Sequence, residues 1–167
     1  MTNLDKEYQR NEYNGRSKFK QLVSNGNNKV EFTNDKFNHI DAYFTSTTTN
    51  YIYGVEVKNR QKKYDKYNTL IVETIKYDAM KEHQDNNDTN ECLIVYFFDT
   101  TAYVLKWSTI NTLLSNNIVN VKYKWLPDST VNKHKMVQKT CIEVPKKYTY
   151  KYEFDTTIGK WKQIQKP

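Results

Sequence analysis

The stretch HIDAYFTSTTTNYIYGVEVKNR, residues 39–60, decides the fold class. It contains two runs in which apolar and polar residues alternate, and a polar, threonine-rich tip, Ser46–Asn50, separates them. Alternation with a period of two is typical of strands, and a short polar tip between two such runs predicts an antiparallel hairpin. The first run carries Asp41 and the second carries Glu56 and Lys58, so the hairpin would bring charged side chains together.

The segments on either side of this hairpin predict a mixed α/β chain of the α+β type. Apolar spacing and the absence of proline indicate a first helix over Leu4–Ser24, with Gly26 near its C-terminal end. The strongest strand pattern is ECLIVYFF, residues 91–98, which with AYVLKWS, residues 102–108, predicts an antiparallel pair of buried central strands. The other expected elements are strands at 29–35 and 69–75, helices at 76–84 and 110–117, and then only loops and edge strands.

We expect one domain over residues 1–167, with a core at about 4–107 and an extension of edge strands and a short helix at 108–167. Aromatic residues make up 14% of the chain and supply apolar area for this core, although the mean hydropathy is only −0.92. No apolar run approaches a membrane span, and no secretory signal is recognisable at the start, so we expect a cytoplasmic protein without membrane contact. Cys92 and Cys141 fit no zinc spacing and are expected to be reduced core thiols.

The charge balance favours a polyanionic partner. Lysine and arginine outnumber aspartate and glutamate by 26 to 19, which gives a formal charge of +7. Aromatic and basic residues interleave in KYKWLP (122–127) and YTYKYEF (148–154), as suits a nucleic-acid surface, although an edge strand guarded by lysines would look the same. The lysines expected to contact nucleic acid in the loop after the hairpin are Lys62, Lys63 and Lys66.

The charged residues of the hairpin predict a metal site. Asp41 and Glu56 lie fifteen residues apart on opposite arms, and Lys58 follows Glu56 by two. Side chains two residues apart share a face of a strand, so Glu56 and Lys58 would project together while Val55 and Val57 point into the core. Two neighbouring carboxylates repel each other, and a hard divalent cation bound by oxygen ligands offsets this repulsion. We therefore expect Asp41 and Glu56 to bind Mg²⁺ or Mn²⁺.

The pattern Ile40-Asp41 followed by Glu56-Val57-Lys58 resembles the PD-(D/E)XK nuclease superfamily, whose hallmark is an acidic residue on one strand and Glu-x-Lys on the next. Ile40 stands where the family name has proline. The expected order of elements is also similar to the family core, over about Glu7–Trp107. The resemblance implies a restriction-endonuclease-like three-layer core, with a central mixed sheet flanked by helices, and hydrolysis of phosphodiester bonds, with DNA as the expected substrate. It also implies that a homodimer would form where both strands must be cut.

The resemblance implies roles for further residues. The main-chain carbonyl of Val57 would be another metal ligand, and a glutamate of the first helix, Glu12 or its competitor Glu7, would complete the metal shell. Lys58 would position or help to deprotonate the attacking water. The supporting catalytic residues on the next strand and helix would be Glu73 and Lys76, with Tyr77 as a contact to nucleic acid.

Other interpretations of the same residues stay open. Asp41, Glu56 and Lys58 would also fit an ordinary ion pair on a solvated strand face. His39, two residues before Asp41, could serve as a general base. The main alternative function is a nucleic-acid-binding or protein-binding module that keeps the fold without chemistry, and a phage-encoded inhibitor of a host protein is a third.

Overall fold

The computed structural model describes residues 3–24, 28–33, 39–60, 67–86, 88–128 and 135–167. Its α-helices are α1 (Asn3–Val23), α2 (Thr74–Asp85) and α3 (Trp107–Ser115), and a short 3-10 helix, η2, spans Lys146–Tyr148. None of the described helices is long and apolar enough to cross a membrane. One sheet is built from β1 (Lys29–Phe32), β2 (Ala42–Thr45), β3 (Ile52–Arg60), β5 (Glu91–Phe98), β6 (Thr101–Lys106), β9 (Tyr150–Asp155) and β10 (Lys160–Gln165), in the order β1-β2-β3-β5-β6-β9-β10. A second sheet is built from β4 (Thr69–Glu73), β7 (Val121–Pro127) and β8 (Met136–Pro145), in the order β4-β8-β7.

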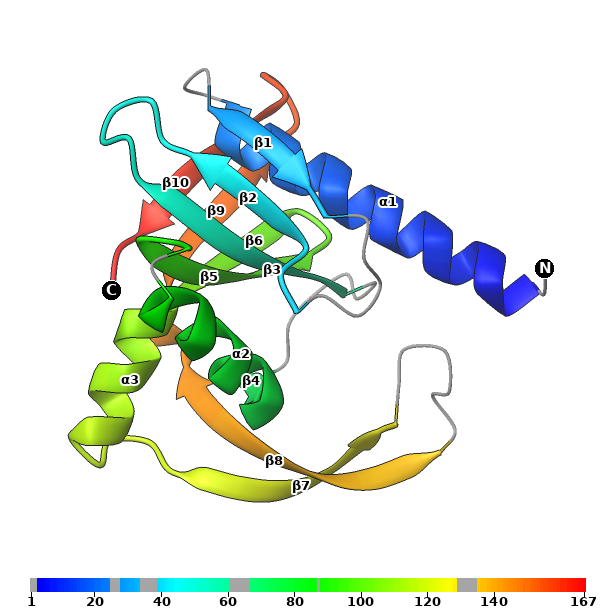
Figure 1. The fold of residues 1–167 in the computed structure, drawn as a ribbon. Coiled ribbons are helices and arrows are strands. Elements are labelled where there is room, and N and C mark those ends of the chain that lie inside the picture. The colour runs from blue at the N-terminus through cyan, green and yellow to red at the C-terminus, as the bar shows by residue number, and fades with distance from the viewer. Residues whose placement is uncertain (1–2, 25–27, 34–38, 61–66, 87, 129–134) are drawn as a thin grey trace.

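The large sheet is covered by α1 on one face and by α2, α3 and the small sheet on the other (Figure 1). On the α1 face, Phe19 packs in a buried cluster with Val55 and other apolar residues of the sheet. On the opposite face, Met80 of α2 and Ile110 of α3 pack with Ile94 and with apolar residues of β4 and β8. β5 is buried on both faces because its apolar run is continuous, as in a strand between two layers.

The path of the chain through the large sheet contains two crossovers, from β3 to β5 and from β6 to β9, and the first of them positions the site described below. β1, β2 and β3 form an antiparallel meander, and β3 then pairs in parallel with β5. A parallel pair cannot be joined by a tight turn, and here β4 and α2 make the connection. The crossover brings the first turn of α2 to β3, where Lys76 reaches Glu56.

The predicted α+β class is confirmed, as are the hairpin of β2 and β3 and the antiparallel pair of β5 and β6. After residue 107 the expected short helix is present as α3, and β7 and β10 are edge strands as expected. The expectation was wrong for β8 and β9, which have partner strands on both sides. β9 lies inside the large sheet between β6 and β10, and β8 is the middle strand of the small sheet. The expected strand at 69–75 is present as β4, which pairs with β8, and Trp107, which we expected in a strand, begins α3.

The two cysteines are structural. Cys92 and Cys141 are both buried free thiols, as predicted. Burial raises the pKa of each thiol above its ordinary value. A thiol with a raised pKa is a poor nucleophile, so neither cysteine is a candidate for chemistry.

Candidate active site

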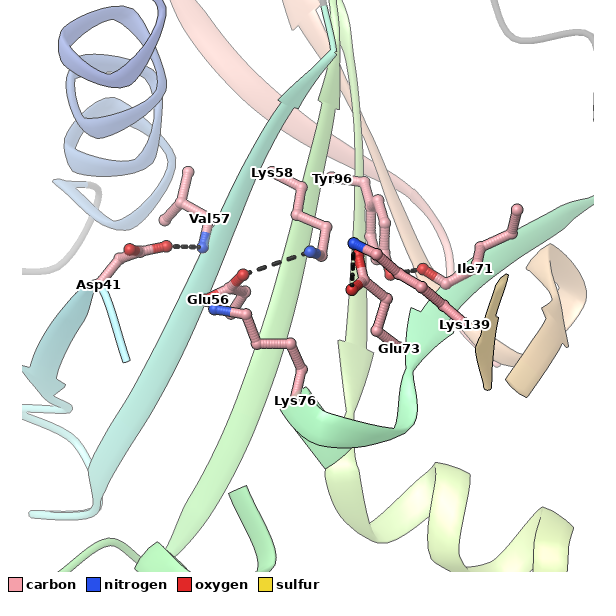
Figure 2. Close-up of polar contacts among 9 residues, drawn as sticks. All are labelled: Asp41, Glu56, Val57, Lys58, Ile71, Glu73, Lys76, Tyr96 and Lys139. Atoms are coloured by element: carbon pink, nitrogen blue, oxygen red, sulfur yellow. Dashed lines mark hydrogen bonds and ion pairs between the residues drawn. The ribbon is translucent and has the colours of Figure 1, made fainter. Parts of the chain in front are cut away.

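Asp41 lies at the point where β2 leaves β3. The regular ladder ends with the pair Ala42 and Val55. Beyond it, Asp41 Oδ2 accepts from the Val57 N–H (2.7 Å; Figure 2). The Asp41 N–H donates to the Val55 carbonyl (2.8 Å), so the two hydrogen bonds bracket Glu56 along β3. Because the N–H and C=O of one strand residue point to the same side, the Val57 carbonyl is also directed to the Asp41 side of β3.

Glu56 is a buried carboxylate, only 5% exposed, in the middle of β3. Its Oε1 lies 3.3 Å from Lys58 Nζ, and its Oε2 lies 2.9 Å from Lys76 Nζ (Figure 2). Lys58 comes from the same strand, as the period of two predicted, and Lys76 comes from the first turn of α2. A buried carboxylate is tolerated only when its charge is compensated, and the two ammonium groups provide that compensation.

The two carboxylates influence each other. Burial, and then the charge of Glu56, raise the pKa of Asp41 to about 6. The Val57 N–H, Lys76 and Lys58 act in the opposite direction by favouring the ionised carboxylate. A raised pKa means that the ionised form of Asp41 costs free energy in the folded state. Such a perturbed carboxyl group beside a second acid is typical of sites that bind a cation or transfer a proton.

α1 is fixed against the same part of β3. A Cβ on Gly15 would lie 3.1 Å from Asn59 Cβ and 3.3 Å from Val57 Cγ1, so a glycine allows the helix to approach this closely. Asn11 Nδ2 donates to the Asn59 carbonyl (3.2 Å), and Asn59 Nδ2 donates to Asn11 Oδ1 (2.9 Å). These contacts hold the α1 turn that contains residues 8–12 beside the end of β3.

α1 contributes Tyr8 and Glu12 to the surroundings of the carboxylates. Burial raises the pKa of the Tyr8 phenol, and the negative charges of Glu12, Asp41 and Glu56 raise it further. Glu12 forms an ion pair with Arg16 one turn later, 2.7 Å from Oε1 to Nη2. The structure therefore places Glu12 on the α1 side of the site, engaged with a cation of its own helix. Tyr8 was missed at the sequence level because a helix tyrosine carries no motif.

Glu73 and Lys139 form a further ion pair next to those of Glu56. Glu73 Oε2 is 3.0 Å from Lys139 Nζ, which reaches it from β8 (Figure 2). Tyr96 lies in register with Lys58 on β5, and its hydroxyl donates to the Ile71 carbonyl of β4 (2.8 Å). Tyr96 thus ties the small sheet to the site. Glu73 compensates the charge of Lys139. No hydrogen bond or ion pair among the described residues joins Glu73 to Glu56, so the structure gives no direct support to its predicted catalytic role.

The structure brings four predicted residues together: Asp41, Glu56, Lys58 and Lys76. Tyr77 is placed elsewhere, because its ring stacks on Trp107 (centroids 5.5 Å apart) and its hydroxyl donates to Asn111 Oδ1 (3.0 Å). Glu7 is exposed on α1, and no hydrogen bond or ion pair among the described residues joins His39 to Asp41 or Glu56. The three loop lysines lie outside the described residues: Lys62, Lys63 and Lys66.

The oxygen donors at this site suit a hard divalent cation with few protein ligands. They are the carboxylates of Asp41 and Glu56 and the carbonyl of Val57. The described part of the chain contains no group of three or more His, Cys, Asp or Glu side chains that could hold a metal. Mg²⁺ needs no such group, since it is commonly held by one or two carboxylates and keeps several waters. The donor set therefore fits Mg²⁺ without a first-helix glutamate.

A scan against protein-family models and searches of curated proteins and solved structures found no match for this chain.

Proposed function

We propose that this chain is a metal-dependent nuclease that hydrolyses phosphodiester bonds of nucleic acid, with DNA as the preferred substrate. The observation that carries the proposal is the proximity of Asp41, just before β2, to Glu56 of β3, with Lys58 and Lys76 paired with Glu56. Apolar residues of similar volume would stabilise this buried position at least as well as ion pairs do. A catalytic role accounts for the charges that stability alone does not require.

The path of the chain supports the same proposal. The family core of helix, strand hairpin, third strand, helix and further strand corresponds in order to α1, β1 to β3, α2 and β5. β4 is an addition that belongs to the small sheet. Asp41 lies where the hairpin parts, and Glu56 and Lys58 lie on the next strand, as the nuclease motif requires.

Asp41, Glu56 and the Val57 carbonyl would hold Mg²⁺ or Mn²⁺. When bound, the cation would withdraw charge from a phosphate oxygen and make water a better nucleophile. Asp41 must be ionised to serve as a ligand, and the Val57 N–H and the neighbouring lysines favour that form. The protein thus supplies the ligands together with groups that favour the ionised form of Asp41.

The two lysines would act on the charge of the substrate. Lys58 approaches one oxygen of Glu56 from the same strand and is positioned to orient water or to neutralise charge that develops on the phosphate. Lys76 approaches the other oxygen from α2, and its flexible stem allows the ammonium group to move from Glu56 to a phosphate oxygen.

One observation favours a second function, in which the fold binds nucleic acid without chemistry. Both oxygens of Glu56 already have a lysine partner, and a cation would have to compete with both. A site closed in this way would also fit a binding module that retains the ion pairs without using them in catalysis. The two functions differ in what removal of a lysine does, because only an enzyme loses turnover.

The experiment is a cleavage assay of purified protein in Mg²⁺ or Mn²⁺ on supercoiled, linear, single-stranded and four-way-junction DNA and on single-stranded RNA. Lys58→Met is compared with Lys81→Met, an exposed lysine of α2 that pairs with Asp85. If the protein is a nuclease, Lys58→Met should abolish cleavage but retain nucleic-acid binding. Lys81→Met should leave cleavage unchanged. Absence of cleavage with intact, salt-sensitive binding would support the binding module instead.

A further inference from the structure

β7 and β8 form a long two-stranded ribbon on the opposite side of the molecule from α1 (Figure 1). Register places Tyr123 opposite Thr140 and Trp125 opposite Gln138. Directly paired residues share a face of the ribbon, which we call the ribbon face. Toward the core, the same face carries Ile142, which is fully buried. The ribbon face therefore begins in the core and continues into solvent.

The outer part of the ribbon face exposes two large aromatic side chains. Tyr123 is 72% exposed and Trp125 is 67% exposed. Met136, at the start of β8 on the same face, is also exposed. Large aromatic side chains normally bury most of their area, and neighbouring exposed rings mark a surface that binds something. By contrast, the second interleaved stretch of the sequence packs Tyr150 and Tyr152 against the α1-side core.

The charges of the ribbon suit an anion. Its described residues, 121–128 and 135–145, contain four lysines and two carboxylates. No carboxylate lies among the outer residues of the ribbon face, which are Tyr123, Trp125, Met136, Gln138 and Thr140. Lys122 and Lys135 have side chains that are 58% and 63% exposed, although each also forms an ion pair, with Glu143 (3.5 Å) and Asp128 (3.4 Å).

The spacing of the two rings suits bases that are not stacked in a duplex. Same-face residues on one strand are about 6.8 Å apart, twice the rise of about 3.4 Å between stacked bases. Rings at this spacing can accept one base between them or hold successive bases of an extended strand. A formal charge of +7 opposes association of two copies and attracts a polyanion, so nucleic acid fits this face better than a second copy does.

We propose that the ribbon face binds single-stranded nucleic acid by stacking bases on Tyr123 and Trp125. The biological role of this surface rests on the proposed nuclease function, because the surface would hold an unpaired strand of the nuclease's substrate. The binding step itself needs neither metal nor cleavage, and it is measured separately from them.

The test is titration of the protein with oligo(dT), oligo(U) and a matched duplex in EDTA, followed by tryptophan fluorescence and by anisotropy of labelled strands. Of the three tryptophans, Trp161 is 5% exposed and Trp107 is stacked on Tyr77, so quenching by a stacked base reports on Trp125. Trp125→Phe should remove the quenching and keep most of the affinity.

Loss of one ring should weaken single-strand binding by about 5-fold to 150-fold, as for other stacked bases. Tyr123→Ala and Trp125→Ala test this, and the matched control is Tyr51→Ala, which removes a half-exposed ring at the turn between β2 and β3. Unchanged affinity in both ribbon variants would overturn the proposal. It would also be overturned if the variants weakened duplex binding equally, or if sedimentation showed that they disrupt a dimer and leave single-strand binding intact.

The outcomes separate this inference from the proposed function. Single-strand binding that needs the two rings, without any cleavage in Mg²⁺ or Mn²⁺, would leave the inference standing and refute the nuclease. Cleavage that needs Lys58, with binding indifferent to Tyr123 and Trp125, would support the nuclease and refute the inference.

Discussion

Replacing Asp41 by asparagine should stabilise the protein at alkaline pH in the absence of metal. The side chain of asparagine keeps an oxygen that can accept the Val57 N–H, but it carries no charge to be buried beside Glu56. Functional residues commonly reduce stability in this way, because an arrangement suited to a ligand is not the most stable one without it.

The magnitude follows from the pKa of Asp41, which is raised from 3.8 to about 6. Between these values the folded protein holds a proton that the unfolded chain has released, so stability falls as the pH rises through this window. The shift of about 2 units corresponds to a loss of about 3 kcal/mol that is complete above pH 6. Asp41→Asn should therefore gain about 1–3 kcal/mol at pH 8 and almost nothing at pH 4.

The assay is urea unfolding in EDTA, followed by circular dichroism, at pH values from 4 to 8. In a parallel thermal scan, a gain of about 2 kcal/mol would raise Tm by about 4–8 °C for a chain of this size. Asp78→Asn, which removes an exposed carboxylate of α2, is the control and should change stability by less than about 0.5 kcal/mol. The reasoning is refuted if Asp41→Asn is no more stable than the wild type at pH 8, or if the difference between them does not vary with pH.

Three further predictions concern the same site. Lys76→Met should destabilise the fold by about 1–3 kcal/mol, because it leaves buried Glu56 with one cation, and a change below 0.5 kcal/mol in urea unfolding would contradict this. Gly15→Val should lower both stability and cleavage, because its side chain meets Asn59 at the α1 contact, and a variant with wild-type Tm and turnover would show that the close approach is not needed. Mg²⁺ at 100 times its Kd should stabilise the wild type by about 2.7 kcal/mol, as measured by thermal unfolding. This stabilisation should decrease below about pH 6, because Asp41 is then protonated, and it should be absent in Asp41→Asn.

The parts of the structure that sequence analysis predicted are those with local causes. A polar tip between two alternating runs fixed the hairpin, and the period of two placed Glu56 and Lys58 on one face. The continuous apolar run of β5 predicted a strand buried on both sides. Each of these signals is contained in a few neighbouring residues.

The parts that it did not predict depend on pairing between distant segments. Glu73 meets Lys139 because β4 pairs with β8, about seventy residues later, and no local pattern specifies that register. β9 looked like an edge strand because tyrosines and lysines alternate through residues 146–152, yet it pairs with β6 on one side and β10 on the other. The position of Tyr8 near the carboxylates likewise depends on the docking of α1 through Gly15.

The most direct test of the proposed active site is the rate of nucleic-acid cleavage in Mg²⁺ and in EDTA for the wild type, Glu56→Gln and Glu82→Gln. Glu82 is an exposed residue of α2 and serves as the matched control. The proposal predicts cleavage by the wild type and by Glu82→Gln in Mg²⁺ only, and a loss of about 100-fold or more in Glu56→Gln. Cleavage that persists in EDTA, or that Glu56→Gln leaves at the wild-type rate, would contradict it.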